Sequence, residues 1–227
     1  ELDLFPLIVA PESWRQIEAG VLQRVRVLDR VMADVYGPRE LLKAGLLPPA
    51  LVRGHPGYLR AMHGVVPVGG TYLHIAAFDL ARGPDGNWWV LGDRMQAPSG
   101  AGFALENRVA TTRALSDIYG EMPVHRLAGF FRRFRDALVK MAEDSSGRVA
   151  ILTPGPLNET YYEHAYIARY LGIMLLEGED LTVTEGRLMV RTVSGLKPIT
   201  VLWRRLDAAF ADPLELRPDS QIGTPGL

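Results

Sequence analysis

The feature that most constrains this 227-residue chain is a β-hairpin signature in its first half. Pro84-Asp85-Gly86 separates the apolar run of residues 71–78 from Trp88-Trp89-Val90-Leu91. Asp-Gly between two β-prone runs is a strong short-range hairpin signal, because glycine adopts positive φ without steric cost. The turn places Asp79 beside Gly92-Asp93-Arg94 on the returning strand. We therefore expect acids and an arginine to meet at one end of two paired strands.

A loop of small residues follows the hairpin and leads into a helix that we expect from about Gly102 to Tyr119. Amide groups at a helix N-terminus attract anions, so Ser99 and Gly100 are candidates for contact with a phosphate or carboxylate. Arg94 precedes the loop and Arg108 follows it, and guanidinium groups bind such anions bidentately. Plain turn chemistry is the alternative interpretation of the loop.

Three polar residues stand side by side at the start of this helix. Glu106, Asn107 and Arg108 are adjacent in sequence, so on a helix they point in different directions. At most two of them reach one ligand, and we select Arg108 together with Asn107 or Glu106.

The two acids of the hairpin are candidate metal ligands. Mg²⁺ takes oxygen ligands from one or two carboxylates together with substrate phosphates, so Asp79 and Asp93 form a possible metal site. Asp93 faces the opposite side of its strand unless a bulge turns it. The alternative is that both acids only make the strand ends soluble.

Helices dominate the first half of the chain. Apolar residues at spacings of three and four predict a long helix from a Ser13 cap to about Tyr36. A short helix from Pro38 to Lys43 comes next, and residues 50–70 are rich in Gly and Pro and predict a loop. A further amphipathic helix is expected over residues 125–143.

The second half has the pattern of an α/β subdomain. Strands are expected at 148–153 and 173–177 around a helix of residues 158–171, which makes a parallel βαβ unit, and strands at 181–184, 188–193 and 199–203 follow. We expect a mixed sheet, with a junction near residues 144–147 that divides the chain into 1–146 and 147–227.

Two pairs of adjacent polar residues stand out in this half. Arg204-Arg205 end the last strand, and because strand neighbours face opposite sides, only one of them reaches a given site. A surface pair of Arg205 with Asp207 or Asp212 is the alternative. Glu163 and His164 lie in the helix, and a lone histidine is more often a core or surface residue than a ligand.

Composition excludes several classes of protein. The chain has no cysteine, which excludes disulfides and thiol catalysis and fits a cytoplasmic setting. Its formal net charge of −1 argues against a nucleic-acid groove, and no apolar run approaches a membrane span. Because it starts at Glu1 and stops after a turn-rich stretch, we interpret it as part of a longer protein.

Several segments, taken in order, resemble the circularly permuted ATP-grasp proteins, type 2. They are residues 90–94, 97–108, 152–156, 163–164, 177–181, 204–205 and 212–217. The chain is more distantly similar to glutathionylspermidine synthetase and eukaryotic glutathione synthetase, which join a carboxylate to an amine through an acyl-phosphate made from ATP. The resemblance implies a partial, circularly permuted ATP-grasp fold and a ligase that uses ATP and Mg²⁺ on small-molecule or peptide substrates.

The resemblance also assigns roles to single residues. It implies Asp79 and Asp93 as metal ligands, Arg94 and Arg108 as catalytic residues, and five substrate-binding positions. These five are Ser99, Gly100, Asn107, Glu163 and Arg204. The strands with the ATP-clasping lysines are expected beyond Leu227.

The chain departs from the family pattern on the returning strand of the hairpin. Gly92 and Arg94 stand where ordinary ATP-grasp enzymes carry Glu-x-Asn, so fewer metal ions are expected to bind. This departure favours an alternative, a degenerate and non-catalytic module that binds an anionic peptide or a partner protein.

Overall fold

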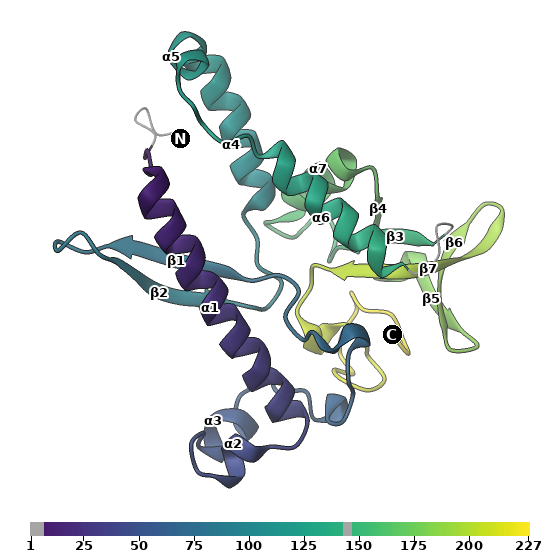
Figure 1. Cartoon of the computed structure of the whole chain (residues 1–227). Coiled ribbons are helices and arrows are strands. Elements are labelled where there is room, and N and C mark those ends of the chain that lie inside the picture. Colours follow the sequence, from purple (N-terminus) through teal and green to yellow (C-terminus); the bar gives the residue numbers. More distant parts are fainter. Residues whose placement is uncertain (1–6, 143–146) are drawn as a thin grey trace. The chain divides into compact units, whose positions relative to one another are not determined.

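The computed structural model describes residues 7–142 and 147–227 (Figure 1). The chain divides into two compact units, Glu1–Pro98 and Ser99–Leu227. The junction expected at residues 144–147 lies, except for Gly147, outside the described residues and stays a prediction. In the part of the chain that the structure describes, no helix has the length and apolar character needed to cross a bilayer.

The first unit begins with helix α1, Pro11–Tyr36, which buries Ile17 and Val35. The prediction of a Ser13 cap was wrong, because the helix starts two residues earlier at Pro11. Proline suits a first helical position, since its fixed φ matches the helix and its missing N–H has no partner there anyway.

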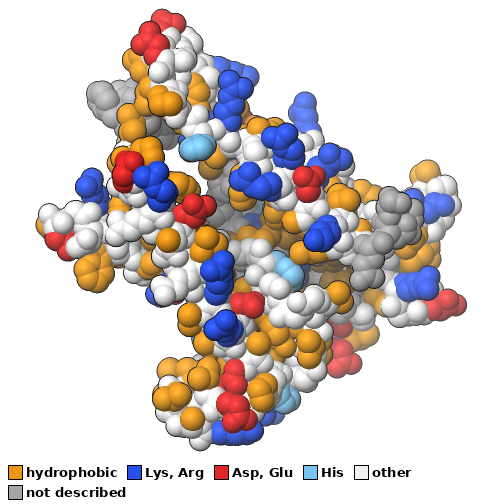
Figure 2. All heavy atoms as spheres, viewed as in Figure 1, with side chains coloured by type: hydrophobic (Ala, Val, Ile, Leu, Met, Phe, Trp, Pro, Cys, Tyr) orange, Lys and Arg blue, Asp and Glu red, His pale blue; other side chains and the backbone are white. Residues whose placement is uncertain are grey.

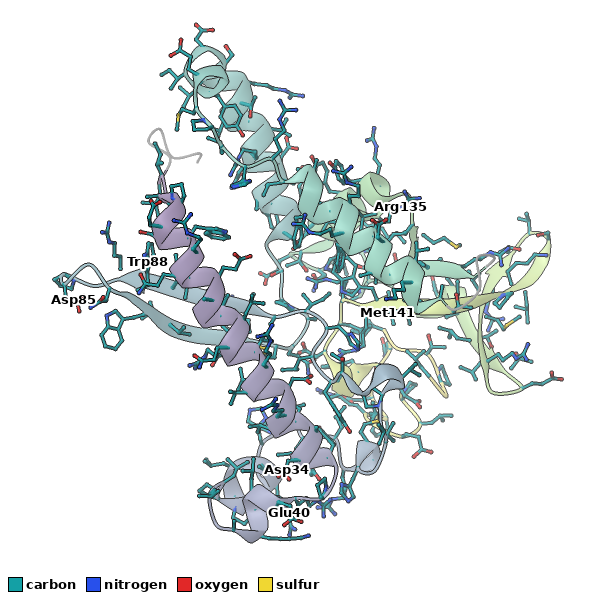
Figure 3. The ribbon with its side chains drawn as sticks, viewed as in Figure 1. Asp34, Glu40, Asp85, Trp88, Arg135 and Met141 are labelled. Carbon is teal, nitrogen blue, oxygen red and sulfur yellow. The ribbon has the colours of Figure 1, made fainter. Side chains whose placement is uncertain are left out.

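Short helices connect α1 to the hairpin. They are α2 (Glu40–Lys43), α3 (Pro49–Arg53) and two 3₁₀ turns, η1 (Arg60–Met62) and η2 (Val68–Gly70), so the expected loop is partly helical. The Asp34 carboxylate accepts the backbone N–H groups of Glu40 and Leu41 at 2.8 and 3.0 Å (Figure 3). Asp29 accepts those of Tyr72 and Leu73, both at 2.8 Å. Two carboxylates of α1 therefore hold the connecting chain against this helix.

The predicted hairpin is confirmed. Strands β1 (Ala77–Arg82) and β2 (Trp88–Arg94) pair antiparallel, and Gly86 in the turn has φ +80°. The register shifts after Asp79, which pairs with Gly92, because Leu80 pairs with Val90 and Leu91 is left over. This bulge turns the end of β2 relative to its start.

The second unit contains a five-stranded mixed sheet in the order β4-β3-β7-β6-β5. The strands are β3 (Arg148–Leu152), β4 (Met174–Leu176), β5 (Leu181–Thr184), β6 (Arg187–Thr192) and β7 (Gly195–Arg204). Strand β3 is parallel to both β4 and β7, so the predicted βαβ unit around helix α7 (Tyr161–Leu171) is confirmed. Strand β7 starts earlier than expected because its first residues pair with β6 in a hairpin. The 3₁₀ turns η3 (Gly178–Asp180) and η4 (Ala208–Phe210) follow β4 and β7.

The second unit has two hydrophobic cores, and helices pack against the sheet to form one of them. The single helix expected from residue 102 to 119 is two helices, α4 (Ala101–Ala114) and α5 (Ser116–Glu121), and α6 spans Ala128–Met141. One core joins side chains of α4, α6, α7 and β3, namely Leu105, Phe131, Ile151, Ile167, Ala168 and Leu171. The other core lies among the strands and the C-terminal turns and includes Leu152, Val190 and Leu206. The described chain is thus a mixed α/β structure, as predicted.

Candidate functional site

The hairpin carries two ion pairs on opposite faces. Arg94 Nε donates to Asp79 Oδ2 at 2.9 Å, and both side chains are about half exposed, at 63% and 48%. Asp93 faces α1 instead, where Arg24 donates to both of its carboxylate oxygens at 2.6 and 2.7 Å. The hydrogen bond from Arg24 lowers the pKa of Asp93 and raises the pKa of Arg24. The bulge at Leu91 does not bring Asp93 to the face of Asp79.

This geometry does not fit a shared magnesium site at Asp79 and Asp93. The two carboxylates lie on opposite faces, and each already accepts hydrogen bonds from an arginine. Among the described residues there is no cluster of three or more Asp, Glu or His side chains that could hold a metal ion. The part that the hairpin acids play in metal binding stays a prediction.

In the second unit, polar residues gather at the C-terminal ends of the parallel strands. Thr153 follows β3, Glu177 follows β4, Arg204 ends β7 and Arg205 comes directly after it. The Arg205 N–H donates to Leu152 O at 2.8 Å, and the Thr153 N–H to Leu176 O at 2.9 Å, so backbone pairing continues past the strand ends. Ligands of α/β proteins bind at this edge of the sheet. The sequence predicted Arg204 at the end of the last strand, but it did not predict that this strand runs parallel to β3.

Glu163 supplies the anion that the sequence led us to expect at the start of α4. Its carboxylate, 1% exposed, accepts the N–H of Gly100 at 2.8 Å and the N–H of Gly102 at 2.9 Å. A carboxylate is favourable there because the first helical amides lack partners within the helix. In this structure the amide of Gly100, a predicted substrate-binding position, is therefore occupied by the protein's own side chain.

His164 is buried between two threonines rather than isolated. Its Nδ1 lies 2.9 Å from Thr153 Oγ1, and its Nε2 lies 3.0 Å from Thr160 Oγ1. Burial, and then the positive charge of Arg205, lowers the His164 pKa to about 4. The imidazole is therefore neutral at pH 7. The sequence carried one signal for this contact, since Thr160 stands four residues before His164, on the same helix face.

The two arginines at the end of β7 differ in exposure. Arg205 is 6% exposed, with its guanidinium carbon 5.1 Å from the centre of the Trp203 ring. Burial lowers its pKa, while the charge of Glu163 acts in the opposite direction. The alternative of a surface pair for Arg205 was wrong, because this side chain is buried. Arg204 is half-buried, donates to Leu206 O, and also has a pKa lowered by burial.

The remaining predicted residues lie along α4. Arg108 Nη1 donates to Tyr119 Oη at 3.1 Å and to His125 O at 3.0 Å, so it holds α5 and the segment before α6 against α4. Ser99 and Asn107 are exposed. Because the hairpin and α4 belong to different compact units, the expected meeting of Asp79 and Arg94 with Ser99 and Arg108 stays a prediction.

One surface of the second unit is basic. The exposed side of α6 carries four cations and one acid, and Figure 2 shows Lys and Arg side chains gathered there. These residues are Arg132, Arg133, Arg135, Lys140 and Asp136. Such a surface attracts anionic ligands at long range without fixing their position.

Comparison with known proteins gives the family. The model for circularly permuted ATP-grasp type 2 matches residues 6–227. An uncharacterized protein of Mycobacterium tuberculosis is 42% identical over 228 residues, which cover 100% of this chain and 26% of that protein. An uncharacterized protein of Synechocystis is 37% identical, with 100% of this chain and 47% of that protein covered. The chain therefore spans less than half of either relative, and it belongs to the circularly permuted ATP-grasp type 2 family.

Proposed function

We propose that the protein is an ATP-dependent carboxylate–amine ligase, to which this chain contributes part of the substrate-handling surface. Membership of the ATP-grasp family supports an ATP-dependent ligation. The observation that carries the proposal is the placement of Arg204 and Arg205 at the C-terminal ends of the parallel strands. Two guanidinium groups at that edge suit a carboxylate substrate and the phosphate that forms on it.

The proposed reaction has two steps. A carboxylate oxygen attacks the γ-phosphorus of ATP, ADP leaves, and an acyl-phosphate forms. The amine nitrogen then attacks the acyl carbon, inorganic phosphate leaves, the nitrogen loses a proton and an amide remains. Arg204, which is only half-buried, is the proposed contact for negative charge on the transferring phosphate. Arg205 is buried, so its positive charge stabilises that negative charge electrostatically and without direct contact.

Trapping of the acyl-phosphate tests this function without knowledge of the amine. The intact protein is incubated with Mg-ATP, pools of amino acids and short peptides, and hydroxylamine, which converts acyl-phosphates into hydroxamates. We expect ATP-dependent hydroxamate and ADP in equal amounts. Arg204→Gln should lower the rate at least tenfold, which corresponds to about 1.4 kcal/mol. Arg169→Gln, an exposed position on α7, should not change it. Failure of the wild type both to bind ATP and to form any hydroxamate would reject the ligase function.

One observation favours the alternative of a non-catalytic module. Asp79 and Asp93 are each neutralised by an arginine, Arg94 and Arg24, so the hairpin offers no unpaired acid pair to a metal ion. A module of this kind binds an anionic peptide through Arg204 and needs neither ATP nor Mg²⁺. Peptide binding that persists in the absence of nucleotide, without hydroxamate formation, would select this alternative.

A further inference from the structure

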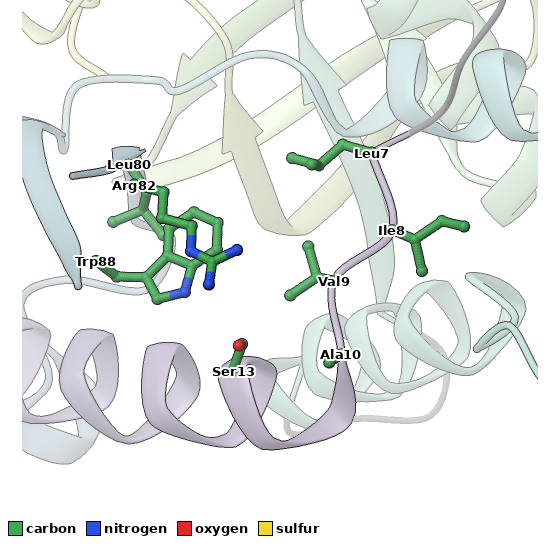
Figure 4. Close-up of a pocket in the computed structure, with 8 residues that line it drawn as sticks. All are labelled: Leu7, Ile8, Val9, Ala10, Ser13, Leu80, Arg82 and Trp88. Atoms are coloured by element: carbon green, nitrogen blue, oxygen red, sulfur yellow. The ribbon is translucent and has the colours of Figure 1, made fainter. Parts of the chain in front are cut away.

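A cavity of about 300 Å³ lies in the first unit, between the start of α1 and the hairpin (Figure 4). It is lined by Leu7, Ile8, Val9, Ala10, Ser13, Leu80, Arg82 and Trp88. This volume is at the lower end of the range of small-molecule sites, about 300 to 1,000 Å³. Nothing in the proposed ligase chemistry uses it, because Leu80 and Arg82 project from the face of β1 opposite to Asp79.

Three hydrogen-bond donors face one part of this cavity. Figure 4 shows the Arg82 guanidinium, the Trp88 indole nitrogen and the Ser13 hydroxyl gathered on one side. Within the described residues the Trp88 Nε1 is buried and has no hydrogen-bond partner. Indole nitrogen only donates, and the guanidinium of the exposed Arg82, whose Nε donates to Gly86 O at 3.3 Å, keeps further N–H donors and its charge, so this side of the cavity favours an acceptor with negative charge. The start of α1, which has no side-chain cap, adds the positive end of a helix dipole.

The other wall is apolar. Leu7 and Val9 point toward the hairpin side chains, and Leu80 closes the cavity from β1 (Figure 4). Leu7 is 82% exposed, so a ligand here would remove a large apolar side chain from water. Inorganic phosphate has no group to cover this wall, and a neutral apolar molecule would leave the indole N–H without an acceptor.

We propose that this cavity binds a small carboxylate with an apolar body. The carboxylate accepts hydrogen bonds from Trp88 Nε1, Ser13 Oγ and the Arg82 guanidinium, and the apolar body packs against Leu7, Val9 and Leu80. An apolar amino acid, a short apolar peptide end and an aryl-alkyl acid share this chemistry. The site is independent of the ligase proposal, since it depends on α1 and the far face of the hairpin.

The indole N–H gives a direct measurement. The intact protein is labelled with ¹⁵N-tryptophan, and its indole resonances are followed during titration with 4-phenylbutyrate. The Trp88 resonance is identified by its loss in Trp88→Phe. We expect it to shift with saturation, while the Trp203 resonance stays in place. Neutral 4-phenyl-1-butanol should bind at least tenfold more weakly, and inorganic phosphate should not shift the resonance.

Matched variants test the donors. Arg82→Gln should weaken 4-phenylbutyrate binding about tenfold, the usual loss for a hydrogen bond to a charged group. Arg53→Gln, an exposed arginine of α3, should leave binding unchanged. The proposal fails if no titrant shifts the Trp88 resonance, if the alcohol binds as tightly as the acid, or if phosphate alone saturates the shift. Free apolar amino acids and C-terminally apolar dipeptides, titrated in parallel, separate the two natural sources of this chemistry.

Discussion

The ionisable groups of the hairpin differ in exposure from those that α7 brings to the parallel sheet edge, beside Thr153 and Arg205. Asp79 and Arg94 form an ion pair in which the side chains are 48% and 63% exposed, whereas Glu163 and His164 are each 1% exposed. Exposed pairs exchange partners at little cost, because water competes for both groups. Buried groups keep theirs, because an unsatisfied charge in the interior is expensive. The buried groups of α7 therefore keep fixed positions, whereas the charged groups of the hairpin can change partners.

Removal of the Glu163 side chain should cause the largest loss of unfolding free energy. Glu163→Ala deletes the acceptor of the Gly100 and Gly102 amides and leaves Arg205 without the opposing charge nearby. Breaking a buried charged arrangement costs about 3 to 5 kcal/mol of unfolding free energy. Urea denaturation measures this cost, and hydrogen exchange should show faster exchange at the Gly100 and Gly102 amides. Glu163→Gln keeps an acceptor oxygen and should cost less.

The matched control for Glu163 is Glu179, an exposed acid in η3. Glu179→Ala should change stability by no more than about 0.5 kcal/mol, as surface substitutions usually do. Equal stability losses in the two variants would mean that the sheet edge does not depend on its buried carboxylate.

His164 should produce the next largest effect, and it depends on pH. The folded-state pKa is about 4, below the ordinary value of 6.5, so the folded protein binds a proton less readily than the unfolded chain. The contribution of His164 to the free energy of unfolding is therefore fully present above pH 6.5 and is lost as the pH falls toward 4. The shift corresponds to about 3 kcal/mol across this window.

His164→Gln provides the comparison for this pH effect. Urea unfolding at pH values from 7 to 4 gives the difference in unfolding free energy between wild type and variant. This difference should narrow as the pH falls, because only the wild type has an imidazole to protonate. If this difference does not change with pH, the site accepts the neutral and the protonated imidazole equally well.

The same contrast explains what could be predicted from the sequence. The hairpin and the βαβ unit follow from local signals, an Asp-Gly turn and two apolar runs around a helix, and both are confirmed. The partner of Asp93 does not follow, because Arg24 is 69 residues away and no periodic pattern links the two positions. Glu163 occupies the start of α4 from 61 residues further along the chain. Long-range pairing of this kind depends on tertiary packing, which local sequence patterns do not specify.

Gly102 allows the close approach of α4 and α7 that Glu163 requires. A Cβ atom at this position would lie 2.7 Å from Glu163 Cγ and 3.2 Å from Ile167 Cγ1. Gly102→Ala should therefore destabilise the protein by about 1 to 3 kcal/mol through overpacking. In Gly120→Ala the new methyl group meets nothing within 4 Å, and alanine favours the helix. If urea denaturation shows the two variants equally stable, the contact between α4 and α7 is looser than these distances imply.

The smallest effect on stability is expected at the hairpin. Asp79→Asn removes the charge from an exposed pair, and exposed pairs contribute between about 0.2 and 1 kcal/mol, less at high salt. The same change should weaken ligand binding if Asp79 and Arg94 separate from each other to contact a substrate. Titration with Mg-ATP then gives weaker binding for Asp79→Asn, although its urea midpoint stays close to that of the wild type. A variant that loses stability on the scale of Glu163→Ala would remove the distinction between an adaptable hairpin and a fixed sheet edge. Unchanged stability together with unchanged binding would instead leave Asp79 without a role in substrate handling.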